Sequence, residues 1–558
     1  MRQASGRLAL LLAAAIALAA PAARVQAAKT LADLQTGRRG QSIAVGTSAR
    51  ATLVDLNPAV GAWFVLTIED ARGAATFHLE SADPGRQRLR LDAAGGGALE
   101  ITTDGAASRC TPWAGPAPDA LERARRSALP FAPLCDGRLF VRNPVPGNRT
   151  TLEATTEFLR DHVWGGERII GFVRREFYRD AFVERAASSP PAAPAAESPA
   201  GAPAPARVRP EASGRSFVPT GLGLDVPGAR EGLLPGRWAA VRGIDGVYLS
   251  AIAPADLAET PPDQVEASAV AFLVAFDLAR LDLGFTLGTE HPRLGWSARV
   301  PDAARDAALP GPDGVASAAP LVRTGMLSPA LAARAVATFT GGFKREHGAF
   351  RYGALAQRRH GSHYGFVEQG VVFSTLQPGL ATLFVTTDGT VGMNTWTDAD
   401  DARLARVRDA RQNGVPLLER DPAGGPALIG PLVGQWGAGN WSGSADEKLR
   451  TLRAGACLVE HGRAHHLLYG YFSAATPVTM ARVFRAYGCA YAMHLDMNAL
   501  EHTYLALYAR EGQRTAVQHL VPGMAQLDRS VRGALVPRFI GVPDDRDFFF
   551  LVRKEPAR

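Results

Sequence analysis

The stretch His466–Asn498 reads HLLYGYFSAATPVTMARVFRAYGCAYAMHLDMN, and it decides how the second half of the chain folds. Its first part, 466–472, is rich in leucine and aromatic residues and predicts a strand. The hydroxyl of Thr476 can then cap a helix, and Pro477 suits the first helical position, where no N–H is needed. The sequence therefore predicts that a helix begins soon after this strand.

This helix is expected to have one apolar face and a defined end. Apolar residues recur at helical spacing, at Met480, Val483, Phe484 and Tyr487. Gly488 can adopt the left-handed conformation that ends a helix. A second strand is expected over 490–495, which puts Asp496 at its carboxyl end. Open α/β sheets place their ligands at that edge, so Asp496 is a candidate site residue.

Strands joined by tight turns surround this unit. Asp388-Gly389 and Gln369-Gly370 each stand between β-prone runs, and a further hairpin is expected to pair 457–459 with 467–469. Together these patterns predict an α+β or α/β fold, with a mixed sheet, helices and hairpins in the C-terminal part.

Composition divides the chain into parts. The segment 186–214 is rich in Pro and Ala and has no hydrophobic period, which is typical of a linker. It separates an N-terminal part, 28–185, from a C-terminal part, 215–558. Short β-prone runs between Gly, Asp and Pro predict a smaller β-rich domain in the N-terminal part. The sequence does not indicate the role of that domain.

The first 27 residues have the pattern of a secretory signal peptide. Arg2 and Arg7 precede an apolar run, Leu8–Ala20, and small residues then predict cleavage after Ala27. The run is shorter than the ~20 residues that a spanning helix needs. The expectation is export to the periplasm or the cell exterior, with no transmembrane segment after cleavage.

The charge balance argues against a nucleic-acid partner. The chain carries 61 Lys+Arg and 54 Asp+Glu, a formal net charge of +7, and loss of Arg2, Arg7 and Arg24 with the signal would leave +4. Nucleic-acid binding usually needs clustered basic residues, and the sequence has no Lys/Arg-rich run.

Export also bears on the four cysteines. In an oxidising compartment they most simply form two disulfide bonds. Cys110 and Cys135 lie in the N-terminal part, and Cys457 and Cys489 lie in the C-terminal part. Pairing within each part is the expectation.

The densest polar cluster follows the second strand. His494, Asp496 and Asn498 alternate there, with Glu501 and His502 close behind. Carboxylates beside an imidazole can supply acid–base or nucleophilic catalysis. The alternative is that Asp496 and Asn498 cap the next turn through their side chains.

Two further patterns have both a binding and a structural interpretation. Gly341-Gly342 can let a ligand approach the backbone, and the neighbouring Lys344 could hold a phosphate, or the glycines form an ordinary turn. His360 and His363 have a spacing that can bind metal on a helix, but the residues around them indicate a loop.

The C-terminal part resembles the phosphodiester glycosidase family, the family of the lysosomal uncovering enzyme, N-acetylglucosamine-1-phosphodiester alpha-N-acetylglucosaminidase. The similarity is carried by four segments in the same order, Thr340–Phe343, Gly414–Leu418, Arg453–Ala456 and Leu495–Asn498. Leu495-Asp496-Met497-Asn498 is most similar to a bacterial branch with Leu-Asp-Ile-Asn, as are Gly342-Phe343-Lys344 and Gln435-Trp436-Gly437. The chain departs from the family at Thr340, where the family has Asn, and at Met497 and Asn498, where it has Gly.

The resemblance implies an exported hydrolase that cleaves the bond between a sugar's anomeric carbon and a phosphodiester. It implies Asp496 as nucleophile, base or oxocarbenium stabiliser, with Glu501 as a second carboxylate. Lys344 and Arg453 would hold phosphate beside Gly341 and Gly342. The remaining candidates, His494, Asn498 and His363, would orient the substrate or move protons.

Two alternatives remain open. One is a non-catalytic envelope protein that binds phosphorylated or acidic glycans. The other is a hydrolase with a divalent metal at His360 and His363. No cofactor is otherwise predicted, and the expected partner is a glycan or sugar phosphate.

Overall fold

The structure is a computed structural model that describes residues 30–114, 118–149, 220–222, 238–257, 264–350, 353–359, 361–434, 448–461, 464–512, 514–531 and 534–555. The predicted signal peptide, the linker 186–214 and the domain boundaries beside it lie outside the described residues. So do Gln435-Trp436-Gly437 and His360. These assignments stay predictions.

The strand–helix–strand unit is formed with nearly the predicted bounds. Strand β23 (Ala464–Ala475) leads into helix α10 (Pro477–Ala486) and then strand β24 (Cys489–Met497). The hydroxyl of Thr476 accepts a hydrogen bond from the Thr479 N–H at 3.2 Å, as expected for a cap. Gly488 has a φ of 75°, the left-handed value predicted for the helix end.

The predicted fold class is confirmed in part. Helices and hairpins accompany the C-terminal sheets, but the structure is mostly β, and the described sheets consist of antiparallel pairs in place of the predicted mixed sheet. Strand β22 (Thr451–His461) forms the predicted hairpin with β23 and also pairs with β24. It therefore lies between the two strands of the unit, which run parallel to each other without pairing. The full order of this sheet is β10 (Ala239–Ala240), β11 (Val247–Ile252), β12 (Ala271–Asp277), β23, β22, β24, β20 (Pro416–Glu419) and β21 (Leu428–Ile429).

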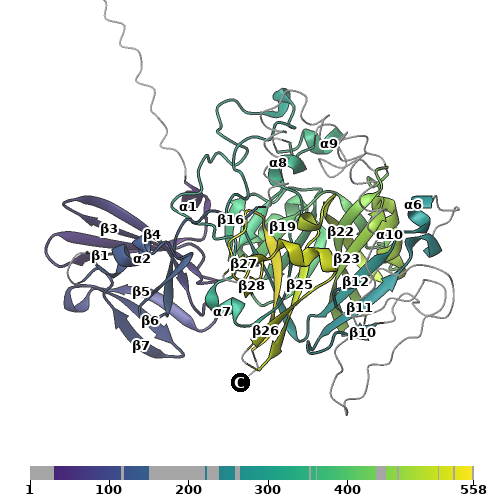
Figure 1. Ribbon diagram of the computed structural model, residues 1–558. Helices are drawn as coiled ribbons and strands as arrows, with labels where there is room; N and C mark the ends of the chain where they lie inside the picture. Colours follow the sequence, from purple (N-terminus) through teal and green to yellow (C-terminus); the bar gives the residue numbers. More distant parts are fainter. Residues whose placement is uncertain are drawn as a thin grey trace, which may run out of the picture.

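The larger part of the molecule also contains a two-stranded sheet of β27 (Arg529–Val531) and β28 (Ala534–Val536) and two five-stranded sheets (Figure 1). One has the order β13 (Leu281–Thr286), β29 (Phe548–Arg553), β14 (Ala335–Thr340), β25 (Leu505–Glu511) and β26 (Arg514–His519). The other has the order β16 (Val371–Ser374), β15 (Phe366–Glu368), β19 (Val407–Gln412), β17 (Ala381–Thr386) and β18 (Val391–Thr395). The predicted hairpins at Gln369-Gly370 and Asp388-Gly389 join β15 to β16 and β17 to β18.

The described residues of the N-terminal part form two antiparallel sheets around a core of their own. The larger sheet has the order β1 (Arg39–Val45), β2 (Ala49–Asp55), β3 (Trp63–Asp70), β4 (Gly73–Ser81), β9 (Leu139–Arg142) and β8 (Phe131–Leu134). The smaller has the order β5 (Gln87–Asp92), β6 (Ala98–Thr103) and β7 (Ala106–Cys110), and the short helix α2 (Ala120–Arg126) packs on β8.

Each disulfide joins two cysteines of the same part of the chain, as predicted. Cys110 is bonded to Cys135, and Cys457 is bonded to Cys489. The second bond joins β22 to β24, the strand that carries Asp496. Within the described ranges, no helix is both long and apolar enough to cross a membrane.

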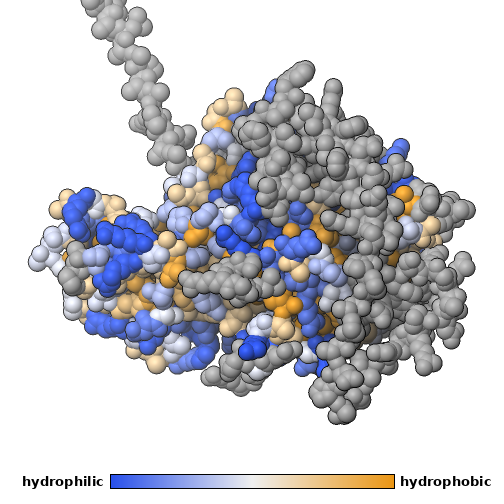
Figure 2. All heavy atoms as spheres, viewed as in Figure 1, coloured by the Kyte–Doolittle hydropathy of each residue, from blue (hydrophilic) through white to orange (hydrophobic). Residues whose placement is uncertain are grey.

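Buried charges fasten the N-terminal sheets to the larger part. Arg142 stacks on the ring of Trp63, with its guanidinium carbon 4.3 Å from the centroid, and pairs with the carboxylate of Glu80. Its Nε donates to the carbonyl of Val322 at 3.0 Å. Glu368, on β15, lies 3.9 Å from the same guanidinium and accepts a hydrogen bond from the Leu287 N–H. Figure 2 shows both parts as one continuous body from this side, with hydrophilic residues spread over each.

Glu368 should make the stability of this junction depend on pH. Burial raises the pKa of Glu368 from 4.5 to about 8, against the opposing effect of Arg142. Between these two values the folded protein holds a proton that the unfolded chain releases, so the unfolding free energy should fall as pH rises. Glu368→Gln should remove a loss of about 5 kcal/mol over that window. Urea unfolding between about pH 5 and pH 9 checks this. Glu69→Gln, at an exposed position, is the control, and an equal slope in wild type and Glu368→Gln would contradict it.

Candidate active site

Asp496 is a buried carboxylate near the end of β24. The residue is 4% exposed. Its Oδ2 accepts a hydrogen bond from Nη1 of Arg546 at 3.0 Å, and its Oδ1 accepts one from the Met497 N–H at 2.8 Å. Burial raises the pKa of Asp496, and Arg546 opposes that shift. The carboxylate is thus fixed in position and only partly compensated, a combination common in catalytic carboxylates.

His494 lies two residues before Asp496 on β24, and Arg453 lies on the neighbouring strand β22. Nη1 of Arg453 is 3.5 Å from Nε2 of His494. Burial, together with Arg453, holds the pKa of His494 well below its ordinary value, so the imidazole is neutral. Arg453 also donates to the carbonyls of Ala475 and Leu449, each at 2.7 Å. The predicted phosphate-binding arginine is therefore already hydrogen-bonded to the end of β23 and to the segment that precedes β22.

Asn498 occupies a position that demands an unusual backbone. Its φ is 78°, in the left-handed region that Gly and Asn adopt most easily. Its side-chain oxygen accepts a hydrogen bond from the Thr451 hydroxyl at 3.0 Å. This explains how Asn can stand where the resembled family has Gly, because both tolerate this conformation.

Gly341 and Gly342 make room for a buried ion pair. A Cβ on Gly341 would lie 2.2 Å from Oδ2 of Asp547, and one on Gly342 would lie 2.7 Å from Nη1 of Arg411. The Gly341 N–H donates to the carbonyl of Asp547 at 2.9 Å. The two glycines thus let the chain pass over the charges of Arg411 and Asp547, a role that the sequence analysis did not foresee.

The ion pair organises the backbone around Asp496. Nε of Arg411 donates to Oδ2 of Asp547 at 2.6 Å, and Nη2 donates to the carbonyl of Phe343 at 2.6 Å. Nη1 donates to Oδ1 of Asn413 at 2.7 Å, and Nδ2 of Asn413 donates to the carbonyls of His494 and Leu495. Hydrogen bonds therefore run without a break from the glycine turn to the strand of Asp496.

Asp547 also holds a histidine that sequence reasoning missed. Its Oδ1 lies 2.9 Å from Nδ1 of His291, and both residues are 1% exposed. Burial alone would raise the pKa of Asp547, but Arg411 and His291 outweigh it and hold the pKa well below the usual range. One signal was available in the sequence, because Asp544-Asp545-Arg546-Asp547 directly precedes an apolar strand.

Other predicted site residues make different contacts from those expected. Lys344 is 2% exposed, and its Nζ lies 3.5 Å from the buried carboxylate of Asp545. The backbone carbonyl of Glu501 accepts a hydrogen bond from Arg538 at 2.8 Å. Nε2 of His363 accepts one from the Ser297 N–H at 3.1 Å. The roles of Lys344, Glu501 and His363 in binding or catalysis stay predictions.

The described residues offer no group of three His, Cys, Asp or Glu side chains arranged to hold a metal ion. The nitrogen of His363 that accepts from Ser297 is also not available as a ligand while that hydrogen bond persists. The metal interpretation thus gains no support from His363.

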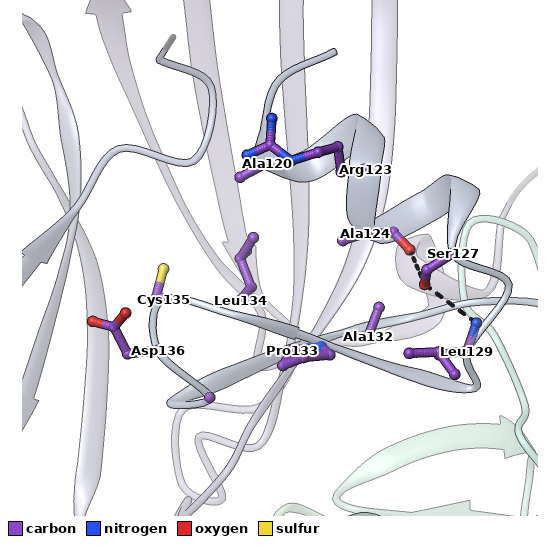
Figure 3. A pocket seen from close by; sticks show the side chains of 11 residues that line it. Ala120, Arg123, Ala124, Ser127, Leu129, Ala132, Pro133, Leu134, Cys135 and Asp136 are labelled. Atoms are coloured by element: carbon purple, nitrogen blue, oxygen red, sulfur yellow. Dashed lines mark hydrogen bonds between the residues drawn. The ribbon is translucent and has the colours of Figure 1, made fainter. Parts of the chain in front are cut away.

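A cavity of about 610 Å³ lies in the N-terminal part, away from Asp496. Figure 3 shows it between α2 and β8, with Arg123 and Leu134 on its walls and Asp136 at its edge. The hydroxyl of Ser127, which also lines it, is engaged with the carbonyl of Ala124 at 2.7 Å. Among the described residues that line this cavity, Asp136 is the one carboxylate, and none is a histidine.

Comparisons with known proteins give distant structural similarity alone. No family model matches the chain, and no curated protein sequence matches it. The catalytic domain of zebrafish N-acetylglucosamine-1-phosphodiester alpha-N-acetylglucosaminidase, auto-inhibited by its pro-peptide, is 10% identical with a TM-score of 0.28, covering 55% of this chain and 82% of that chain. A hypothetical protein from Synechocystis is 9% identical with a TM-score of 0.26, covering 57% and 64%.

A third similar structure is that of a Burkholderia pseudomallei protein described as exported. It is 10% identical with a TM-score of 0.22, covering 51% of this chain and 74% of that chain. Similarity at this level does not show an activity for this chain.

The glycine turn gives a direct test of the site's construction. Gly341→Ala should lower the unfolding free energy by about 1–3 kcal/mol, because the added methyl would overlap the Asp547 carboxylate. Gly37→Ala is the control, since a Cβ there meets nothing within 4 Å. Chemical denaturation of both variants makes the comparison, and equal stabilities would contradict the described packing.

Proposed function

We propose that this protein is an exported hydrolase that cleaves the bond between a sugar's anomeric carbon and a phosphodiester. The observation that carries the proposal is the Asp496 carboxylate, which is buried and held by Arg546 and the Met497 N–H, on the strand that also carries the neutral imidazole of His494. The resemblance of Leu495-Asp496-Met497-Asn498 to the bacterial branch of the phosphodiester glycosidases agrees with it.

This reaction requires few catalytic groups. A phosphate ester is already a good leaving group, so strong general-acid help at the departing oxygen is not needed. The essential group is a carboxylate at the anomeric centre, where positive charge develops in the transition state. Asp496 supplies it, and its two hydrogen bonds fix the direction in which the carboxylate can act. Arg546 carries the nearest cationic charge for the departing phosphate.

The second candidate is a non-catalytic glycan-binding protein. It is favoured by Lys344 and Arg453, the two cations predicted to hold phosphate, which are 2% and 0% exposed and already engaged by protein groups. In that case the region around Asp496 would bind an acidic glycan without cleaving it.

Export rests on a separate set of observations. The first 27 residues have the n-region, apolar run and small-residue site of a signal peptide. Two disulfides, Cys110–Cys135 and Cys457–Cys489, fit an oxidising compartment. We therefore propose that the mature protein acts in the periplasm or outside the cell.

Asp496→Asn tests the catalytic proposal. The substitution keeps the shape of the side chain and removes its charge, so turnover of a nitrophenyl sugar-phosphodiester panel should be abolished. The thermal midpoint should stay near that of wild type, because relief from the cost of burying the carboxylate offsets the one hydrogen bond that Asn, with a single acceptor oxygen, cannot accept. Asp528→Asn, which alters a buried aspartate held by His519 and Tyr504, is the control for general damage.

Two results would contradict the proposal. Full turnover by Asp496→Asn would remove Asp496 from catalysis. A wild-type protein that binds a sugar phosphate but turns over none of the panel would favour the glycan-binding candidate.

A further inference from the structure

His291 has the surroundings of an oriented base. Its Nδ1 lies 2.9 Å from Oδ1 of Asp547, whose other oxygen is fixed by Arg411 at 2.6 Å. Because Asp547 is ionised, it accepts the proton of Nδ1, and in this tautomer the basic lone pair lies on Nε2. Aspartate plays this positioning role for histidine in many hydrolases.

The Nε2 edge of the His291 ring is buried. His291 is 1% exposed, and within the described residues its Nε2 has no hydrogen-bond partner. The same holds for both carboxylate oxygens of Asp545, which is fully buried 3.5 Å from Lys344. A buried polar atom without a partner costs about 1–3 kcal/mol, so such atoms in a native protein point to a functional role.

His291 belongs to the same network as Asp496. Asp547, its partner, directly follows Arg546, which donates to Asp496. Asp547 and Arg411 also both act electrostatically on the Asp496 carboxylate. The histidine lies 256 positions from Asp547 in sequence, so only the fold brings it here.

We propose that His291 is a further catalytic residue of this site, and that its Nε2 takes the proton of the attacking water. The inference rests on the proposed function and adds a base to it. In the same proposal Asp547 is a positioning residue, because it holds Nδ1 of His291 and leaves Nε2 to accept the proton.

The Asp496 carboxylate first bonds to the anomeric carbon as the bond from that carbon to the phosphate oxygen breaks, and the phosphate monoester leaves. The water oxygen then bonds to the anomeric carbon, its proton passes to Nε2 of His291, and the bond to Asp496 breaks. The carboxylate is regenerated, and the imidazolium releases its proton to solvent. Glu346 interacts electrostatically with His291, and its side chain is 18% exposed.

Azide rescue tests this assignment. Azide attacks the anomeric carbon without losing a proton, so it does not need the base. With the full-length mature protein and the nitrophenyl panel, His291→Ala should lower kcat by about 10²–10⁴-fold. Added azide should restore turnover and yield the glycosyl azide as product. His519→Ala, which alters another buried histidine paired with an aspartate, should respond to azide no more than wild type. His291→Gln is the second variant, in case the cavity left by alanine impairs folding.

Each outcome decides the question. Rescue by azide in a His291 variant, without rescue at His519, supports the base. Unchanged kcat in both His291 variants, or a lowered kcat that azide does not restore, overturns it. Failure of the proposed function is distinguishable, because wild type would then turn over none of the panel, and the role of His291 would fall with it.

Discussion

The buried ion pair of Arg411 and Asp547 is the constraint on which the centre of the molecule depends. Both side chains are shut off from water, at 0% and 1% exposure, so every charge must be satisfied by protein groups. The guanidinium is satisfied by Asp547, the Phe343 carbonyl and Asn413, and the carboxylate by Arg411 and His291. Removing either partner would leave a buried charge without compensation.

This pair also joins the three large sheets of the larger part. Arg411 lies on β19, Asp547 immediately precedes β29, and Asn413 binds the backbone of β24. Asp496 stands where these elements meet, so its position follows from the need to satisfy the pair. The closeness of Gly341 and Gly342 to the same charges has the same origin. The site is therefore a consequence of the packing between sheets, and no single loop builds it.

Local signals in the sequence were sufficient for local structure. Thr476, Pro477 and Gly488 fixed the bounds of α10, and Asp388-Gly389 fixed a hairpin, because each acts on its own backbone. The order of strands could not be read in this way, since it depends on the pairing of β22 with both β23 and β24. The same limit applies to the site. Asp496 and His494 are neighbours in sequence, but His291, Arg411 and Asp547 meet only in the fold, and the burial of Lys344 depends on Asp545.

The most direct test of this account is a crystal structure of the Asp496→Asn variant soaked with a sugar 1-phosphate. The account predicts the anomeric carbon against the side chain at position 496, the Arg411–Asp547 pair intact beneath it, and Nε2 of His291 directed at the sugar-facing side. A sugar phosphate bound elsewhere on the molecule, with no contact to position 496, would contradict it.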